Sequence, residues 1–168
     1  MPKIIEHLQT RLMEETVRQI KENGYGAVTI RSIARGCGVG TGTVYNYYPS
    51  KDSLIASYLL EDWRTCIRSI ASEAAGAGMP QPVLRRIFEE LRGFQDRHST
   101  IFQDEAAASG FAGSFSRYHA LLRSQLAAPL RKFCSNDFTA EFAAEALLTW
   151  TMVGTSFEEI CQLLEKLF

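Results

Sequence analysis

Residues 29–51 read TIRSIARGCGVGTGTVYNYYPSK, and this stretch predicts two short helices around a glycine-rich turn. Ile30 and Ile33 recur at helical spacing behind Thr29, whose hydroxyl can accept a free backbone N–H bond as an N-cap. Two glycines then end the first helix, and a second helix runs through the threonines and tyrosines that follow until Pro49 ends it. Two helices joined by so short a turn cross steeply, which predicts a helix-turn-helix.

The second helix of such a motif enters the major groove of DNA, and residues near its N-terminus contact the bases. Glycine at this point lets the backbone approach a phosphate or base edge, while threonine offers a hydroxyl and a methyl group. Asn46 can hydrogen-bond an adenine edge, and the hydroxyls and rings of Tyr45 and Tyr47 can reach phosphates or a thymine methyl. Lys51, which opens the next helix, is placed for a phosphate.

The stretch closely resembles the DNA-binding region of the TetR family of bacterial transcriptional regulators. Residues 42–51 match the family pattern of Gly-Thr, an aliphatic residue, Tyr, any residue, an aromatic pair and Pro-Ser-Lys nearly throughout. One departure is Gly40, where the family commonly has a Ser or Thr cap. The resemblance implies that the residues facing DNA are Thr29, Arg31, Thr41, Gly42, Thr43, Tyr45, Asn46, Tyr47 and Lys51, the last of which clamps a phosphate. From the residues alone, Thr29 has the alternative of a simple helix cap and Arg31 that of a solvated helix face.

Apolar stripes at helical spacing extend over the rest of the chain, which predicts an all-α fold. A stripe from Ile4 to Ile20, ended by Asn23 and Gly24, completes a three-helix head, so we expect a helix-turn-helix DNA-binding domain over residues 1–52. A long helix joins this head to a helical ligand-sensing and dimerisation domain over residues 53–168. The helices expected in that body cover residues 54–70, 83–94, 101–108, 115–133, 142–153 and 157–168. Pro129 should kink or split its helix.

Composition limits the possible functions. The chain has 168 residues, 46% of them hydrophobic, and no apolar run approaches the length of about 18 residues that spans a bilayer. The first residues, MPKIIEHLQTR, are interrupted by charge, so we expect a cytoplasmic protein. The net charge of −1 hides an asymmetry, because residues 1–51 hold seven Lys or Arg against four Asp or Glu. A mildly basic head on an acidic body suits a motif-directed DNA contact.

The reactive side chains give no sign of an enzyme, a metal site or a cofactor. Cys37, Cys66, Cys134 and Cys161 lie 29, 68 and 27 positions apart, which is no metal-ligand spacing. Reduced, buried thiols are expected, with a redox switch as the alternative. The glycines before Thr43 lack both dinucleotide and nucleotide-loop spacing, and the three histidines are scattered.

The last two predicted helices carry more apolar side chains than one stripe can bury, which predicts a homodimer. In the TetR family the final two helices form a four-helix bundle with those of a second copy. The interface is expected to contain Ala143, Leu147, Trp150, Phe157, Ile160 and Leu164. The alternative is that these residues complete the core of one protomer.

The resemblance also implies a cavity for a small-molecule effector inside the body. Candidate lining residues, which combine rings with a few polar groups, are Trp63, Phe88, Phe102, Tyr118, His119 and Trp150. The alternative is that they are ordinary core aromatics. The sequence therefore predicts a ligand-responsive repressor that binds a palindromic operator as a homodimer and is released by a small molecule. The alternative is a helical dimeric ligand-binding or protein-interaction module whose head does not bind an operator.

Overall fold

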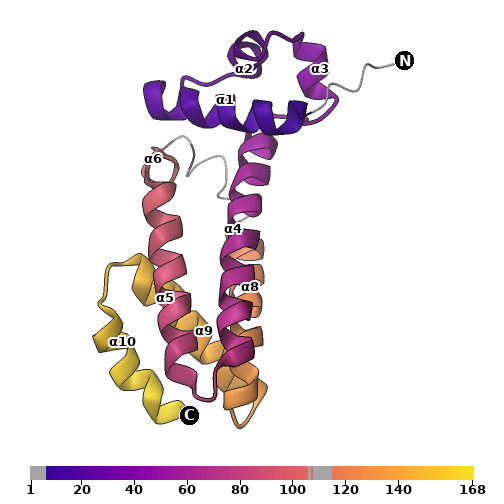
Figure 1. Ribbon diagram of the computed structural model, residues 1–168. Helices are drawn as coiled ribbons and strands as arrows, with labels where there is room; N and C mark the ends of the chain where they lie inside the picture. The colour runs from indigo at the N-terminus through magenta and orange to yellow at the C-terminus, as the bar shows by residue number, and fades with distance from the viewer. Residues whose placement is uncertain (1–6, 106, 108–114) are drawn as a thin grey trace. The chain divides into compact units, whose positions relative to one another are not determined.

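The computed structural model describes residues 7–105, 107 and 115–168, and over these residues every regular element is a helix (Figure 1). The predicted all-α class is therefore confirmed. The start of the predicted N-terminal stripe at Ile4 and part of the helix expected over residues 101–108 lie outside the described residues. None of the described helices is both long and apolar enough to cross a membrane.

The chain divides into two compact units, the first of which joins Met1–Glu61 to His98–Ala112. Its helices are α1 (Leu8–Asn23), α2 (Ile30–Gly36), α3 (Thr41–Tyr45), the start of α4 (Lys51–Gly76) and α6 (Ser99–Phe102). Side chains from each of these helices form one core, in which Leu12, Ile33 and Val44 are fully buried. This unit is called the head below.

Local signals explain where the head helices begin and end. Gly24 follows α1 with φ +78°, a left-handed conformation that favours glycine. Thr29 caps α2 as predicted, and Gly38 at φ +67° turns the chain behind it. Helix α3 ends at Tyr45, earlier than predicted, because the residue before Pro49 is disfavoured in the helical conformation and the last turn loosens.

The head also includes residues that follow the body helix α5 in the sequence. Ile101 and Ala107 are 5% and 2% exposed and belong to the core of the head. His98, only 2% exposed, contacts the ring of Tyr58 edge-on, with 5.1 Å between the ring centroids. The packing units therefore do not follow chain order, and the division at residue 52 stays a proposal about function.

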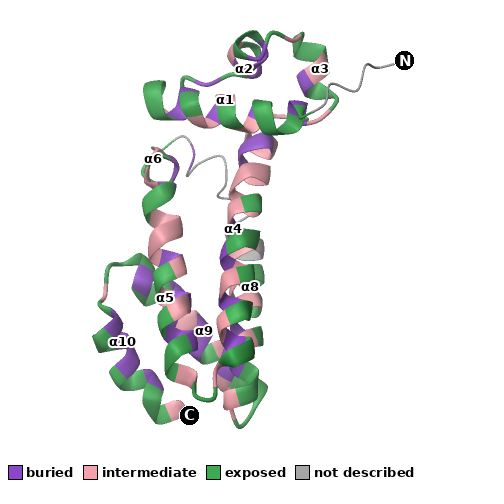
Figure 2. Cartoon of the chain, viewed as in Figure 1, coloured by how far each residue is buried: buried purple, intermediate pink, exposed green. Residues whose placement is uncertain are grey.

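The second unit, called the body, joins Asp62–Arg97 to Gly113–Phe168. Besides the rest of α4, its helices are α5 (Pro80–Arg97), α8 (Phe115–Ala127), the 3₁₀ helix η2 (Ala128–Phe133), α9 (Asp137–Met152), α10 (Phe157–Leu164) and the 3₁₀ helix η3 (Glu165–Leu167). Pro129 lies where α8 gives way to η2, so the predicted split is confirmed. Buried and exposed positions alternate along these helices (Figure 2).

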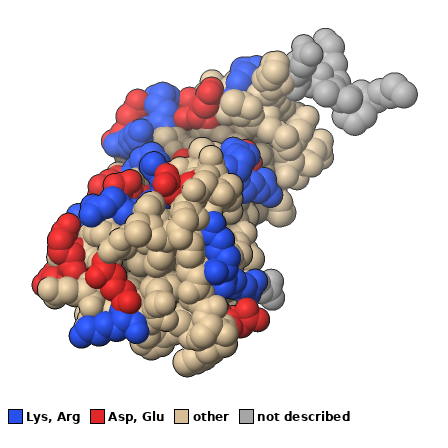
Figure 3. Space-filling view, turned by 60° about the horizontal axis from the view of Figure 1, so that its bottom comes forward, with Lys and Arg blue, Asp and Glu red and all other residues tan. Residues whose placement is uncertain are grey.

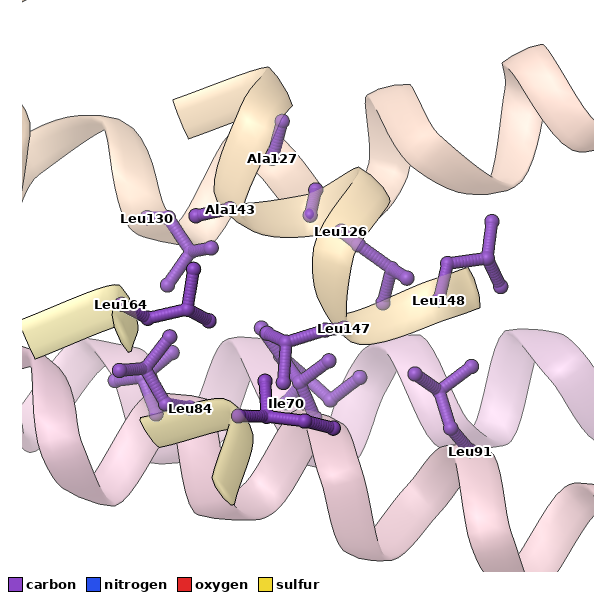
Figure 4. Packing of buried hydrophobic residues seen from close by; sticks show 14 of the residues in the cluster. Ile70, Leu84, Leu91, Leu126, Ala127, Leu130, Ala143, Leu147, Leu148 and Leu164 are labelled. Carbon is purple, nitrogen blue, oxygen red and sulfur yellow. The ribbon is translucent and has the colours of Figure 1, made fainter. Parts of the chain in front are cut away.

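Helix α9 is central to the body because it packs against both α5 and α8, while α10 packs against α5 and α9. Leu84, Leu130 and Leu164 come from three different elements and point toward one another in the core (Figure 4). Lys132 donates a hydrogen bond to the carbonyl oxygen of Ala77 at 2.9 Å and another to that of Ala74, which satisfies carbonyls at the end of α4.

Candidate nucleic-acid interface

Helix α2 is fixed to α1 by a polar network. The Gln19 side-chain amide donates to the backbone carbonyl oxygen of Ser32 at 3.0 Å, and the Ser32 hydroxyl donates to the Gln19 Oε1 atom at 2.6 Å. Ser32 also forms a capping box with Thr29, whose hydroxyl accepts from the Ser32 N–H at 3.0 Å. Because Gln19 is only 8% exposed, these bonds replace those that water would otherwise make. Thr29 is exposed, and it serves as the cap that the sequence offered as the alternative.

Gly36 at the end of α2 faces the side chain of Glu15 on α1. A Cβ atom added there would lie 2.0 Å from the Glu15 Oε1 atom, so no side chain fits unless Glu15 moves. Glu15 is held in turn, because Arg18 donates to it at 2.6 Å and Gln19 at 2.7 Å. The hydrogen bond from Arg18 lowers the pKa of the Glu15 carboxyl below its ordinary value. Sequence reasoning used Gly36 only as a helix stop and missed its part in packing.

Helix α3 is held from one side and open on the other. Val44 is fully buried and Tyr48 is 6% exposed, so these two side chains anchor the helix to the head. Tyr45, by contrast, is 56% exposed. Gly40 is the N-cap of α3. Because glycine has no side chain, it supplies no side-chain hydrogen bond to the first turn, as the sequence predicted. Of the nine residues expected at DNA, the exposed ones are Thr29, Arg31, Thr41, Gly42, Tyr45 and Asn46, and the half-buried ones are Thr43, Tyr47 and Lys51.

Lys51 has partners within the head that the sequence did not predict. Its ammonium donates to the Tyr25 carbonyl oxygen at 2.9 Å and lies 4.3 Å from the centroid of the Tyr25 ring. The Tyr25 hydroxyl donates to the carboxylate of Asp52. Burial and then this hydrogen bond raise the pKa of Tyr25 well above its ordinary value. The contacts of Tyr25 were not predicted, because the sequence shows only that a tyrosine follows Gly24, where the first helix ends.

Comparison with known proteins places this motif in a family. Residues 12–58 match the model described as "Bacterial regulatory proteins, tetR family", and they run from within α1 into α4. The helix-turn-helix segment matches the TetR family. The predicted resemblance is confirmed, and a family of regulatory proteins agrees with the prediction that the chain is not an enzyme.

Curated proteins similar to this chain include repressors. It is 28% identical over 102 residues to the HTH-type transcriptional repressor KstR of Mycolicibacterium smegmatis, covering 61% of this chain and 50% of that one. It is 35% identical over 108 residues to KstR of Mycobacterium tuberculosis, covering 59% and 49%. The chain thus spans about half the length of these curated relatives.

Solved structures share the fold along almost the whole chain. FadR of Thermus thermophilus, a TetR-family repressor in complex with lauroyl-CoA, has a TM-score of 0.65 at 21% identity, covering 95% of this chain and 92% of that one. A TetR-family transcriptional regulator from Streptomyces coelicolor has a TM-score of 0.60 at 18% identity, covering 94% and 95%. At these identities the likeness concerns the fold.

The aromatic residues expected around an effector belong to both units and differ in burial. Trp63 is buried and donates to the Gln125 side chain at 2.7 Å, whereas Trp150 is 55% exposed. Phe102 belongs to the head, and Phe88 packs edge-on against Phe157 in the body. Tyr118 and His119 are half-buried on α8, and His119 lies 2.9 Å from a Glu145 oxygen. Two surface hollows in the body, of about 540 and 470 Å³, are lined by other residues.

Most of the residues expected at a dimer interface are buried within one protomer, which favours the alternative that they complete its core. Five of them are at most 7% exposed and lie in the core of the body: Ala143, Leu147, Phe157, Ile160 and Leu164. They are buried because α5 and α8 cover one side of α9 and α10 closes against it. Trp150 alone among the six is exposed. The opposite side of α9 instead exposes Phe138 and Phe142, at 76% and 52%, and Val153, the residue directly after the helix, is 68% exposed.

All four cysteines are free thiols, and burial raises the pKa of each above its ordinary value, to about 11 for Cys66 and Cys161. Such thiols are poor nucleophiles and poor metal ligands. Among the described residues, no group of three or more His, Cys, Asp or Glu side chains is placed to hold a metal ion.

Proposed function

We propose that this protein is a transcriptional repressor that binds a palindromic operator as a homodimer and leaves it when a small molecule binds. The observation that carries the proposal is the two-sided character of α3. Its buried side, at Val44, fixes the helix, and its other side presents Tyr45 and Asn46 to solvent. A short, firmly held helix with polar groups on its open side suits the major groove of DNA.

Within this proposal the residues divide by chemistry. Thr41 and Gly42 at the start of α3 approach the base edges, and Tyr45 and Asn46 follow one turn later. Arg31, exposed on α2, contacts a phosphate. On the face of the molecule shown in Figure 3, Lys and Arg side chains are interspersed with Asp and Glu, and no broad basic patch is seen there. Affinity depends on the local contacts of α2 and α3 and on a second head.

The second copy joins at the exposed side of α9. Phe138 and Phe142 lie one turn apart with 6.4 Å between ring centroids, and Val153 extends the same side toward the end of the helix. Trp150 flanks this row and is 55% exposed. Side chains this large and apolar lose unfavourable contact with water when a matching face covers them. A two-fold pairing then places two recognition helices about one turn of DNA apart.

The effector binds in the body and acts by shifting the population of dimers whose heads fit the operator. Because one structural relative carries lauroyl-CoA, a fatty acyl-CoA thioester is the first compound class to test. Coupling of about 1–3 kcal/mol between effector and DNA is enough for a 5- to 150-fold change in operator affinity.

The test is a titration of the protein with DNA from beside its own gene, at several salt concentrations, against the same DNA with its sequence scrambled. We expect tighter binding to the native sequence and a negative slope of log affinity against log salt concentration. Equal affinity for native and scrambled DNA at every salt concentration would remove the operator from the proposal. Repeating the titration with lauroyl-CoA tests release.

A further inference from the structure

A hollow of about 470 Å³ lies in the body between the start of α5 and α10, which pack against each other (Figure 1). Gln81, Pro82 and Arg85 line it from α5, and Phe157 and Cys161 line it from α10. None of the residues expected around the effector belongs to this lining. The volume falls within the range of about 300–1,000 Å³ that small-molecule sites occupy. The hollow is therefore large enough for a ligand of its own.

Arg85 forms one end of the hollow and lies over an aromatic ring. Its guanidinium carbon is 4.2 Å from the centroid of the Phe157 ring, and Phe88 packs edge-on against that ring with 5.5 Å between centroids. Phe157 is only 7% exposed, so its ring is a fixed support for the guanidinium. A guanidinium carries its five N–H donors at its edge, and one that rests on a ring keeps these donors free for a partner.

The charge of Arg85 is not neutralised within the described part of the chain. No carboxylate of a described residue forms an ion pair with it, whereas the neighbouring Arg86 lies 3.6 Å from carboxylate oxygens of both Glu73 and Glu89. The hollow thus offers this cation beside apolar side chains. An anionic group is attracted to such a cation, and the attraction is stronger where apolar surroundings exclude water.

Glu165, the first residue of η3, forms the other end of the hollow and has donors of its own. The Gln81 amide donates to it at 2.5 Å and the Cys161 thiol at 3.3 Å. The bond from Gln81 and then that from Cys161 hold the pKa of Glu165 below its ordinary value, so this carboxylate is charged at neutral pH. Phe157 and Glu165 are eight positions apart, which separates the two ends by about 12 Å along the helix. A ligand that fits has a negative group at the Arg85 end and an uncharged remainder.

The space between these two ends is apolar. Pro82 and Met79 line it, and Met79, which directly precedes α5, is 54% exposed. A methionine side chain is flexible and adapts its shape to an apolar chain beside it. Such a chain would also remove the exposed Met79 from water, which is favourable.

We propose that this hollow binds a medium-chain carboxylate. The carboxylate accepts hydrogen bonds from the edge of the Arg85 guanidinium, and the alkyl chain lies along Pro82 and Met79. The separation of the two ends limits the length of the chain, because a longer one would meet the charged Glu165. The site lies apart from the residues expected at DNA and around the effector, so the proposal goes beyond the proposed function and does not depend on it.

The first experiment titrates the full chain with octanoate at pH 7 and follows ¹³C-labelled methionine methyl groups by NMR. Met79 lines the hollow, whereas Met13 lies on α1 and Met152 at the end of α9. We expect the Met79 signal to shift and to saturate with a Kd of about 1–10 mM, the range for a ligand of so few atoms, while the other two signals stay in place. A Met79 signal that is unchanged at about 50 mM octanoate, or equal shifts at all three methionines, would overturn the proposal.

The second experiment repeats the titration with Arg85→Gln and with Arg92→Gln as the matched control. Both substitutions remove one positive charge from α5, but Arg92 lies about two turns beyond Arg85 and does not line the hollow. Arg85→Gln should weaken octanoate binding about tenfold or more, and Arg92→Gln by less than about twofold. Wild-type affinity in Arg85→Gln, or an equal loss in both variants, would overturn the proposal.

Arg85→Lys keeps the charge but loses the planar edge of the guanidinium, and it should weaken binding by about two- to fivefold. Circular dichroism checks that each variant is folded. If Arg85→Gln does not fold, the lysine variant decides, and wild-type affinity in it would overturn the proposal. The operator titration contains no octanoate, so its failure concerns the proposed function and an unchanged Met79 signal concerns only this site.

Discussion

Helices α3 and α9 both bury one side and expose the other, but they expose different chemistry. On α3 the buried Val44 lies opposite threonine, glycine, tyrosine and asparagine. On α9 the buried side is built of alanines and leucines, and large apolar rings at Phe138 and Phe142 face outward. A polar open face suits hydrated DNA grooves, whereas an apolar one suits another protein surface. The exposed side of a helix, more than its buried side, therefore indicates which kind of partner the helix binds.

The largest effect is expected from making the open side of α9 polar. Phe142→Glu should convert the homodimer to a monomer and lower operator affinity by about 100-fold or more, because one head then binds without the other. Sedimentation velocity at micromolar concentration, together with the operator titration, measures both effects. Ser124→Glu, at an exposed polar site on α8, is the matched control. A Phe142→Glu dimer of unchanged stability would remove α9 from the interface.

Making the open side of α3 smaller should have the next largest effect. Tyr45→Ala is expected to lower specific operator affinity by about 10- to 100-fold through loss of about 1–3 kcal/mol of contact. The helical content and the dimer should stay unchanged, since Tyr45 is 56% exposed and the α9 face is untouched. Tyr118→Ala in the body is the control, measured without effector. Undiminished discrimination between operator and scrambled DNA would show that α3 does not read the bases.

Gly42→Ala should change the stability of α3 and the affinity for the operator in opposite directions. Nothing lies within 4 Å of a Cβ atom at Gly42, so alanine should stabilise α3 by about 0.5–1 kcal/mol. The same methyl group would stand between the backbone and DNA, and operator affinity should fall about tenfold. Thermal unfolding and the operator titration measure the two effects. Gly76→Ala, also without neighbours within 4 Å, should leave affinity unchanged, and a stable Gly42→Ala variant with full affinity would place DNA elsewhere.

The smallest effect concerns Glu145, which lies on α9 and contacts His119 and Arg123 of α8. Burial would raise the pKa of this carboxyl, but hydrogen bonds from His119 and Thr149 outweigh it and lower the pKa below the ordinary 4.5. A lowered pKa means that the charged form stabilises the fold above pH 4.5 and that this contribution fades as the pH falls further.

Glu145→Gln should therefore cost about 0.5 kcal/mol at pH 7, a small value because the side chain is 37% exposed and solvent screens its pairs. Urea unfolding at pH 7 and pH 3 measures the effect, which should be lost at the lower pH. An equal loss of unfolding free energy at both pH values would show that the charge of Glu145 is not the cause of the loss. Gln162→Glu, exposed on α10, controls for a change of one charge.

Local signals made the helices and the motif predictable. Thr29 and the glycines that follow α2 decide the conformation of their own backbone, so neighbouring residues were enough to place α2. The end of α3 was misplaced because the helix loosens before Pro49 at a point where the side chains still suggest a helix. The candidate DNA residues came from the motif itself, and their contacts with DNA remain predictions.

Features that depend on distant contacts were not predictable. Helix α9 has apolar residues on both sides, and periodicity alone does not tell which side α5 and α8 cover. The alanines and leucines were therefore assigned to a partner, while the outward phenylalanines were overlooked. The partner of Lys51 lies 26 positions away at Tyr25, in a loop that carries no regular pattern. The aromatic residues suggested around an effector lie on different predicted helices. The apolar pattern of one helix does not tell where it lies relative to another.

The contribution of Ile101 and Ala107 to the core of the head has a consequence for how such regulators diversify. A recombination event that joined residues 1–61 to a different body would leave behind His98, Ile101 and Ala107, which are buried in the head. An exchanged head would have to bring the segment after α5 with it or find a substitute in its new host. A fusion of residues 1–61 to an unrelated body is therefore expected to unfold at a lower temperature than the head does in the intact chain.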